Sequence, residues 1–174
     1  MTKPSIINLV ADLVDRYHTR DPFELCDYLN INLYKHKLGS LKGYYLFYNN
    51  NHHIVLNSNL TRREQRIILG HELGHALEHS GLSHFFSETA NLLESKDRIE
   101  LEANLFCAEL LISDIDILSF AEYDSSINNL CDCLALPDWL IDCKVQMLIS
   151  KGYTDFHYMY IATKNSIKTL STLP

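Results

Sequence analysis

The sequence lacks the long apolar stretches of a membrane protein. No apolar run in its 174 residues approaches the eighteen or more that span a bilayer. The opening Met-Thr-Lys-Pro-Ser has no charged-then-apolar pattern of the kind found in secretory signals. Internal repeats, low-complexity tracts and an interdomain linker are also missing. We therefore expect a cytoplasmic protein, with one domain over residues 1–152 and a C-terminal tail, 153–174, whose structure the sequence does not decide.

Positive charge and paired cysteines are scarce. Fifteen Lys and Arg stand against 22 Asp and Glu, a net charge of −7 without a basic stripe, so direct nucleic-acid binding is not expected. The five cysteines form no C-x-x-C pair, and we expect them to be reduced and mostly buried. Cys131 and Cys133, with His157 downstream, imitate a metal site, but C-x-C departs from the usual structural zinc spacing.

One stretch does carry the pattern of a catalytic site. His71-Glu72-Leu73-Gly74-His75 matches H-E-x-x-H, which is typical of zinc hydrolases. On a helix, residues four apart lie on one face, so a single Zn²⁺ could bind both His71 and His75. Glu72 projects about 100° round the helix, beside the metal, where it could take a proton from a bound water. The pattern can arise by chance, so its surroundings must support it.

The surroundings of this motif predict a helix. Thr61 and Glu64 are spaced as a capping box, in which each side chain satisfies the other residue's backbone N–H. The helix that starts there carries Ile67 and Ile68 before the motif, and Gly81 ends the run. The H-E-x-x-H stretch is therefore expected in mid-helix, as its chemistry requires.

The other segments predict an α+β fold that is mostly helical, with a small antiparallel sheet of about three strands. Periodicity and capping residues predict further helices, and alternation around an Asn-rich turn predicts strands. The helices are expected at 5–18, 22–29, 98–112, 114–120, 127–136 and 137–152, the strands at 31–37, 43–48 and 53–57, and a loop at 80–97.

Catalytic zinc usually keeps three protein ligands, so a third ligand should come from a second helix. Glu100 is the best candidate, and Asn104, one turn further on, is placed to hydrogen-bond a ligating histidine. Glu102 points about 200° away from Glu100, so both cannot face the metal. Spacing alone supports two roles for Glu100 equally, that of a metal ligand and that of a solvated glutamate. The lesser alternatives are Glu88, Glu94 and His84.

The segment from Glu100 to Leu111 resembles the E-x-x-A-N-x-F-A-x-x-L-L signature of the ImmA/IrrE family of metallopeptidases. The H-E-x-x-H stretch and its lead-in from Arg66 to Gly70 are similar to that family's zinc motif. Ile54-Val55-Leu56-Asn57 and Leu136-Pro137-Asp138-Trp139-Leu140 also resemble family segments. Cys107, where the family usually has alanine, is a small buried-type replacement.

The resemblance implies a zincin-like metallopeptidase domain in which His71, His75 and Glu100 hold Zn²⁺, Glu72 is the catalytic base and Asn104 supports a ligand. Many relatives carry a helix-turn-helix domain that we do not find here, so the chain resembles the short members encoded by phages and mobile elements. Those act as antirepressors. The implied function is a zinc-dependent endopeptidase that cleaves a specific regulatory protein, its cognate helix-turn-helix repressor.

Two questions stay open at the level of sequence. A zinc-containing protein that inactivates a repressor by stoichiometric binding, without cleaving it, fits the same motifs, and an acidic surface would engage a basic partner in either case. An oxyanion donor is also expected, and the sequence does not rank its candidates. These candidates are Tyr44, Tyr45, His79 and His84.

Overall fold

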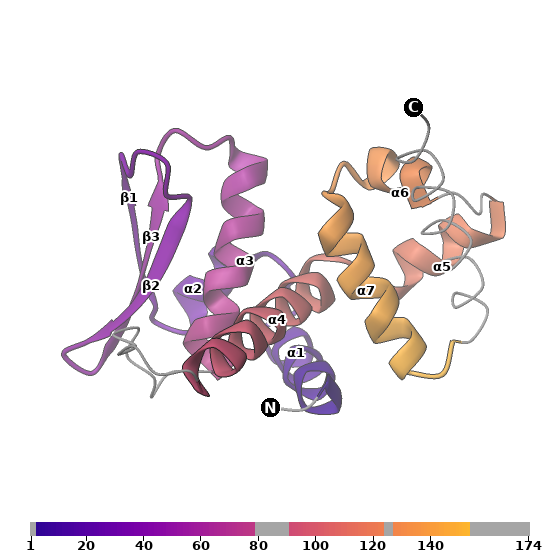
Figure 1. Cartoon of the computed structure of the whole chain (residues 1–174), viewed down its shortest axis with the longest axis horizontal. Helices are drawn as coiled ribbons and strands as arrows, with labels where there is room; N and C mark the ends of the chain where they lie inside the picture. The colour runs from indigo at the N-terminus through magenta and orange to yellow at the C-terminus, as the bar shows by residue number, and fades with distance from the viewer. Residues whose placement is uncertain (1–2, 79–90, 124–126, 154–174) are drawn as a thin grey trace. The chain divides into compact units, whose positions relative to one another are not determined.

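Seven helices and three strands make up the part of the chain that the computed structural model describes, namely residues 3–78, 91–123 and 127–153 (Figure 1). By their internal contacts these residues fall into two compact units, 1–111 and 112–174. The expectation of a single domain over 1–152 stays a prediction. None of the described helices has both the length and the apolar character required to cross a lipid bilayer.

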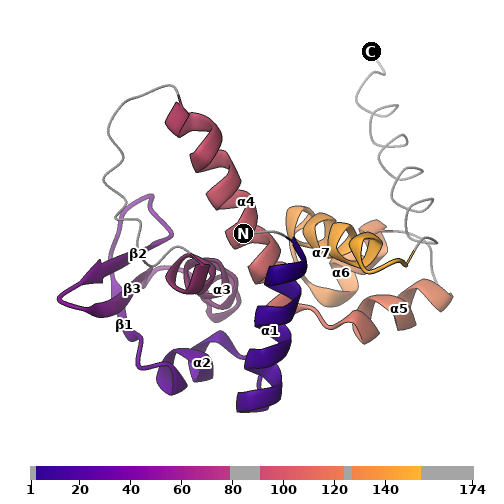
Figure 2. The ribbon, with the colours of Figure 1, turned by 90° about the horizontal axis from the view of Figure 1, so that it is seen from below.

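The first unit contains four helices and the sheet. Its helices α1 (Lys3–Tyr17) and α2 (Pro22–Tyr28) precede the strands, and α3 (Arg62–Glu78) and α4 (Asn91–Leu111) follow them. Helix α3 packs against α4 and against strands of the sheet, and α1 packs against α4 (Figure 2). Side chains from all these layers form a core that excludes water; among them are Ile6, Val10, Leu25, Ile54, Leu56, Leu69, Leu73, Leu105 and Phe106.

The sheet is mixed, which corrects the expectation of a wholly antiparallel one. Strand β2 (Gly43–Tyr48) pairs antiparallel with β3 (Asn51–Asn57), but β1 (Asn32–His36) pairs parallel with β3. The order is therefore β1-β3-β2, with β3 in the centre. In this central strand, which has a neighbouring strand on each side, Ile54, Val55 and Leu56 are all buried.

Local chemistry explains several element ends. Asn49 and Asn50 have φ values of 49° and 57°, the left-handed conformations that a two-residue hairpin turn requires. The Asp21 side chain caps α2 by accepting from the Phe23 N–H, as the Asp-Pro pair predicts. The Arg20 guanidinium donates to the carbonyls of Glu109 and Leu110, at 2.8 and 3.2 Å, and so satisfies the end of α4.

Helix α4 begins earlier than the sequence predicts. Residues 91–97 were expected to be part of a loop, but they are helical. This stretch contains two leucines, a glutamate and a lysine and neither glycine nor proline, so its helix propensity is high despite its polar character. The spacing of apolar residues did not predict this part of the helix, because the first turns of a helix that are mostly polar have no apolar stripe.

The second unit contains α5 (Asp114–Tyr123), α6 (Ile127–Leu134) and α7 (Asp138–Ser150), close to the expected ranges. Its buried Lys144 donates to the Asp114 carboxylate at 2.6 Å, and Lys151 donates to the same carboxylate at 2.8 Å. Partial burial alone would raise the pKa of Asp114, but hydrogen bonds from the two lysines outweigh it and hold that pKa below its usual value. The predicted tail, from 154 on, lies outside the described residues.

Candidate metal centre

The middle of α3 carries the H-E-x-x-H residues, and local sequence fixes where this helix starts. The Thr61 N–H donates to Glu64 Oε2 at 2.8 Å, and the Glu64 N–H donates to Thr61 Oγ1 at 3.3 Å. The predicted capping box is therefore present. It starts the helix ten residues before His71, so both histidines lie within regular helical turns.

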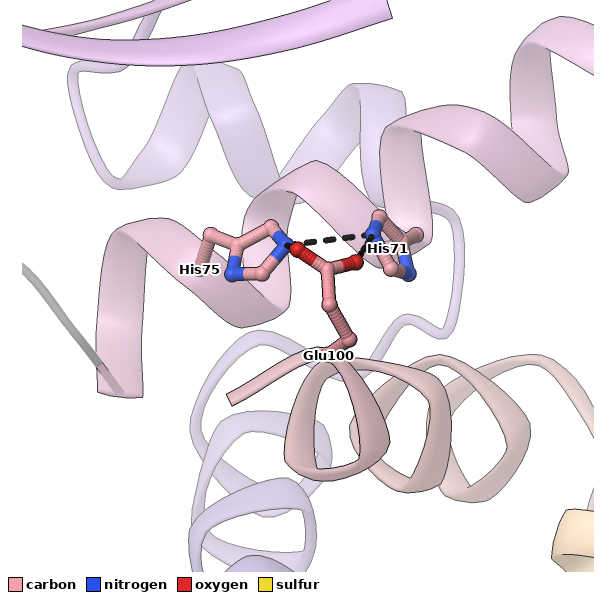
Figure 3. Close-up of side chains that lie close together, drawn as sticks. All are labelled: His71, His75 and Glu100. Atoms are coloured by element: carbon pink, nitrogen blue, oxygen red, sulfur yellow. Dashed lines mark hydrogen bonds and ion pairs between the residues drawn. The ribbon is translucent and has the colours of Figure 1, made fainter. Parts of the chain in front are cut away.

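His71 and His75 from α3 meet Glu100 from α4 (Figure 3). The Nε2 atoms of the two histidines are 3.1 Å apart. Glu100 Oε2 lies 3.4 Å from Nε2 of His71, and Glu100 Oε1 lies 3.7 Å from Nε2 of His75. The histidine side chains are 15% and 3% exposed and that of Glu100 is 44% exposed, so the group is open to solvent on the side of Glu100.

These separations suit a single small cation. Ligand atoms at roughly 2.0–2.1 Å from a tetrahedral Zn²⁺ lie about 3.3 Å from each other, which is close to the three separations observed. Burial alone would lower the pKa of His71, but the carboxylates of Glu100 and Glu72 outweigh it and raise that pKa above its usual value. The surroundings of the His71 imidazole therefore favour a positive charge. Two imidazoles and one carboxylate are also the donor set of many catalytic zinc sites.

Asn104 contacts one of these two histidines, as its spacing from Glu100 predicts. Its Oδ1 lies 2.9 Å from Nδ1 of His71 and can only accept there, so Nδ1 carries the proton. The lone pair of that imidazole is then on Nε2, the atom that faces Glu100 and His75. Such outer contacts fix the tautomer and the ring orientation of a metal ligand.

Glu72 is held between α3 and the sheet. Its side chain is buried, and its carboxylate accepts a hydrogen bond from the backbone N–H of Tyr45 in β2. Burial raises the pKa of Glu72 to about 7; the Glu100 carboxylate adds to the rise, while the charge of His71 and the Tyr45 N–H oppose it. A carboxyl group with such a pKa can exchange a proton near neutral pH.

Two glycines allow the elements around the site to approach closely. A Cβ on Gly74 would lie 3.1 Å from Cα of Ala103, so α3 and α4 touch backbone to backbone between the histidines and Glu100. A Cβ on Gly43 would lie 2.7 Å from the Ile68 side chain, so β2 lies directly against α3. The role of Gly74 was not predicted from the sequence, although its place inside the H-E-x-x-H motif was a usable signal.

The other predicted residues lie apart from the three candidate ligands or outside the described part. Glu102 pairs with Arg98 at 3.0 Å, in agreement with its predicted direction. The Tyr45 hydroxyl is hydrogen-bonded with Nδ1 of His52 at 2.9 Å, and Tyr44 lies on the opposite face of β2. The contact of the Tyr45 N–H with Glu72 was missed, because no sequence pattern reports a backbone contact between distant elements. The side chains of His79, His84, Glu88 and Glu94 lie outside what the structure describes.

Among residues 6–78, 97–120 and 130–153, His71, His75 and Glu100 are the group of side chains that could hold a metal. Cys131 and Cys133 do not join such a group within these residues. Burial, reinforced by nearby aspartates, raises the pKa of Cys131 to about 11, which disfavours the thiolate that binds metals.

Comparison with known proteins points to a peptidase family. Residues 26–135, more than half of the chain, match the family model described as the IrrE N-terminal-like domain, a peptidase family. The chain is 33% identical over 136 residues to the "Uncharacterized immunity region protein 2" of Bacillus phage phi105, covering 78% of this chain and 85% of that protein. It is 27% identical over 113 residues to "Metallopeptidase ImmA" of Bacillus subtilis strain 168, covering 65% of this chain and 66% of that protein.

Proposed function

The chain belongs to the IrrE N-terminal-like domain family of peptidases, and from that we propose that it is a zinc-dependent endopeptidase that cleaves a specific regulatory protein. The family expected from the two motifs is confirmed. The observation that carries the proposal is the convergence of His71, His75 and Glu100, whose ligand atoms all lie within 4.8 Å of one another. Glu72, beside them, supplies the acid–base group that hydrolysis requires.

Zinc is the metal that these donors suit best. Imidazole nitrogens favour zinc and later transition metals, whereas magnesium and calcium prefer sites made of oxygen donors. Three protein ligands leave a fourth position for water or substrate, which is the arrangement of catalytic rather than structural zinc. The exposed side of Glu100 is consistent with such an open position.

The chain's own residues divide the work of peptide hydrolysis. Zinc, when bound, polarises the scissile carbonyl and lowers the pKa of water in the site. Glu72 takes a proton from that water and delivers it to the leaving amine. The Tyr45 N–H holds the Glu72 carboxylate toward the site, and Asn104 holds His71 in the tautomer that presents Nε2.

We propose a helix-turn-helix repressor as the substrate. The relative from phage phi105 is named for an immunity region, and an endopeptidase that removes a repressor would act as an antirepressor. The net charge of −7 favours association with a basic protein over direct contact with nucleic acid.

Cleavage of the helix-turn-helix repressor encoded in the same genome tests the function. Wild type, Glu72→Gln and the control Glu24→Gln, an isosteric change on an exposed residue of α2, would be incubated with it, with and without a chelator. We expect defined fragments from wild type and Glu24→Gln and none from Glu72→Gln or with chelator, while Glu72→Gln keeps one zinc per chain. Full cleavage by Glu72→Gln would refute the mechanism. An intact repressor that nevertheless releases its operator would instead identify a stoichiometric binding protein.

A further inference from the structure

The face of the sheet opposite α3 is rich in exposed apolar and aromatic side chains. Because Gly43 touches Ile68 of α3, side-chain alternation directs Tyr44, Leu46 and Tyr48 to the opposite face of β2. Together with Tyr34 of β1 they form a surface that we call the outer sheet face. Their exposed fractions are 44% for Tyr34, 39% for Tyr44, 43% for Leu46 and 62% for Tyr48. In a solvated sheet face this row of positions is usually polar.

The strand register makes this surface continuous and rigid. Tyr34 and Tyr44 both pair with Val55 from opposite sides, so their side chains flank the central strand. The Tyr34 ring stacks on His36 and on His53, with ring centroids 6.5 and 6.0 Å apart. Rings fixed on paired strands lose little conformational entropy when a partner binds, which favours their use as anchors.

The charge of this region is opposite to that of the rest of the chain. Residues 28–63 contain five Lys and Arg and no Asp or Glu, so they carry a charge of +5. The other ten Lys and Arg and all 22 Asp and Glu lie elsewhere, where the charge is −12. Lys37 and Lys42 are exposed at the end of the outer sheet face that carries His36. These two lysines beside the outer sheet face favour a partner segment of negative charge.

The same strands also border the candidate active site. Strand β2 is an edge of the sheet, and the Tyr45 backbone N–H reaches the Glu72 carboxylate. A protein bound to the outer sheet face and passing over the edge of β2 would therefore arrive beside Glu72. One partner chain could therefore bind the outer sheet face and also present a peptide bond to the candidate active site.

We propose that the outer sheet face is a docking surface for the protein substrate, which it holds through an acidic segment that bears apolar side chains. The inference rests on the proposed function and adds how the substrate is chosen. Tyrosine anchors with a basic rim match the usual anatomy of protein interfaces. The basic DNA-binding surface of a repressor would be repelled here, so the docking segment lies outside that surface.

Steady-state cleavage of two substrates tests the proposal: the intact repressor and a short synthetic peptide that spans the cleaved bond. Tyr34→Ala and Lys37→Glu alter the docking surface. The matched controls are Tyr28→Ala, which removes an exposed tyrosine stacked on Tyr17, and Arg16→Glu, which reverses an exposed charge on α1. Circular dichroism would show that every variant is folded.

We expect each docking variant to raise KM for the intact repressor about tenfold, as loss of an anchor residue does, with kcat unchanged. Cleavage of the peptide should be unchanged, and the controls should match wild type on both substrates. An unchanged KM for the repressor, or equal losses on both substrates, would overturn the docking proposal while leaving the protease intact. Competition by a single-stranded thymidine oligonucleotide would also overturn it, by identifying a nucleic-acid surface. Failure of wild type to cleave either substrate would instead refute the proposed function, and the docking role with it.

Discussion

Replacement of Gly74 by alanine tests whether the contact between α3 and α4 sets the geometry of the metal site. The added Cβ would lie 3.1 Å from Cα and 3.2 Å from the carbonyl oxygen of Ala103, and 3.2 Å from Cδ1 of Phe106. Ala103 and Phe106 are fully buried, and two of the three contacts are with backbone atoms, so no side chain can turn away. Helix α4 must move by a few tenths of an ångström.

Two opposing terms give the expected size of the effect. Alanine is favoured over glycine inside a helix by about 1 kcal/mol. Overpacking a fixed interior costs about 1–3 kcal/mol, so we expect a net loss of up to about 2 kcal/mol in the free energy of unfolding. Glu100 lies one turn before Ala103 on α4 and moves with it. Because metal sites tolerate deviations of only about 0.2 Å, we expect zinc affinity to fall about tenfold or more.

Gly70→Ala is the matched control on the same helix. Its Cβ would meet only side-chain atoms, Sγ of Cys107 at 3.1 Å and Leu111 at 3.5 Å, which can adjust without moving α4. Zinc affinity would be measured by competition with a chromophoric chelator, and stability by urea denaturation of the metal-free proteins. The reasoning would be refuted if Gly74→Ala were more stable than wild type, as helix propensity alone predicts, and bound zinc with unchanged affinity.

Three further predictions follow from other contacts. Asn104→Ala should weaken zinc binding about 10–100-fold through loss of the His71 contact; an unchanged chelator competition would contradict this. Asp114→Asn should destabilise the fold by about 3–5 kcal/mol because the buried Lys144 loses the carboxylate with which it pairs, with the loss largest at neutral pH. The pKa of Asp114 is lower in the folded state than in the unfolded state, so ionised Asp114 stabilises the fold at pH values above its unfolded pKa. This stabilisation disappears as the pH falls through the folded pKa. Urea midpoints measured at several pH values would show the loss. With free zinc at a hundredfold its Kd, removal of the zinc should lower the free energy of unfolding by about 2.7 kcal/mol. In thermal melts, His75→Ala should abolish the difference between the samples with and without zinc.

Local sequence determined most elements and the outline of the candidate site. The capping box at Thr61, the Asp-Pro start of α2 and the asparagine turn each predicted an element boundary, because the residues that fix it are neighbours in the chain. The spacing of His71 and His75, and of Glu100 and Asn104, placed each pair on one helix face. Helical periodicity transmits that information without any knowledge of the fold.

Only the tertiary structure decided how these local pieces combine. The parallel pairing of β1 with β3 joins strands that are not consecutive in the chain, so no local turn between them records it. The approach of Glu100 to the two histidines depends on α4 packing against α3 at Gly74, and the Tyr45 contact with Glu72 depends on β2 lying against α3. These contacts join residues about twenty to thirty positions apart. Their energies come from close packing and shared burial, which no pattern of neighbouring residues records.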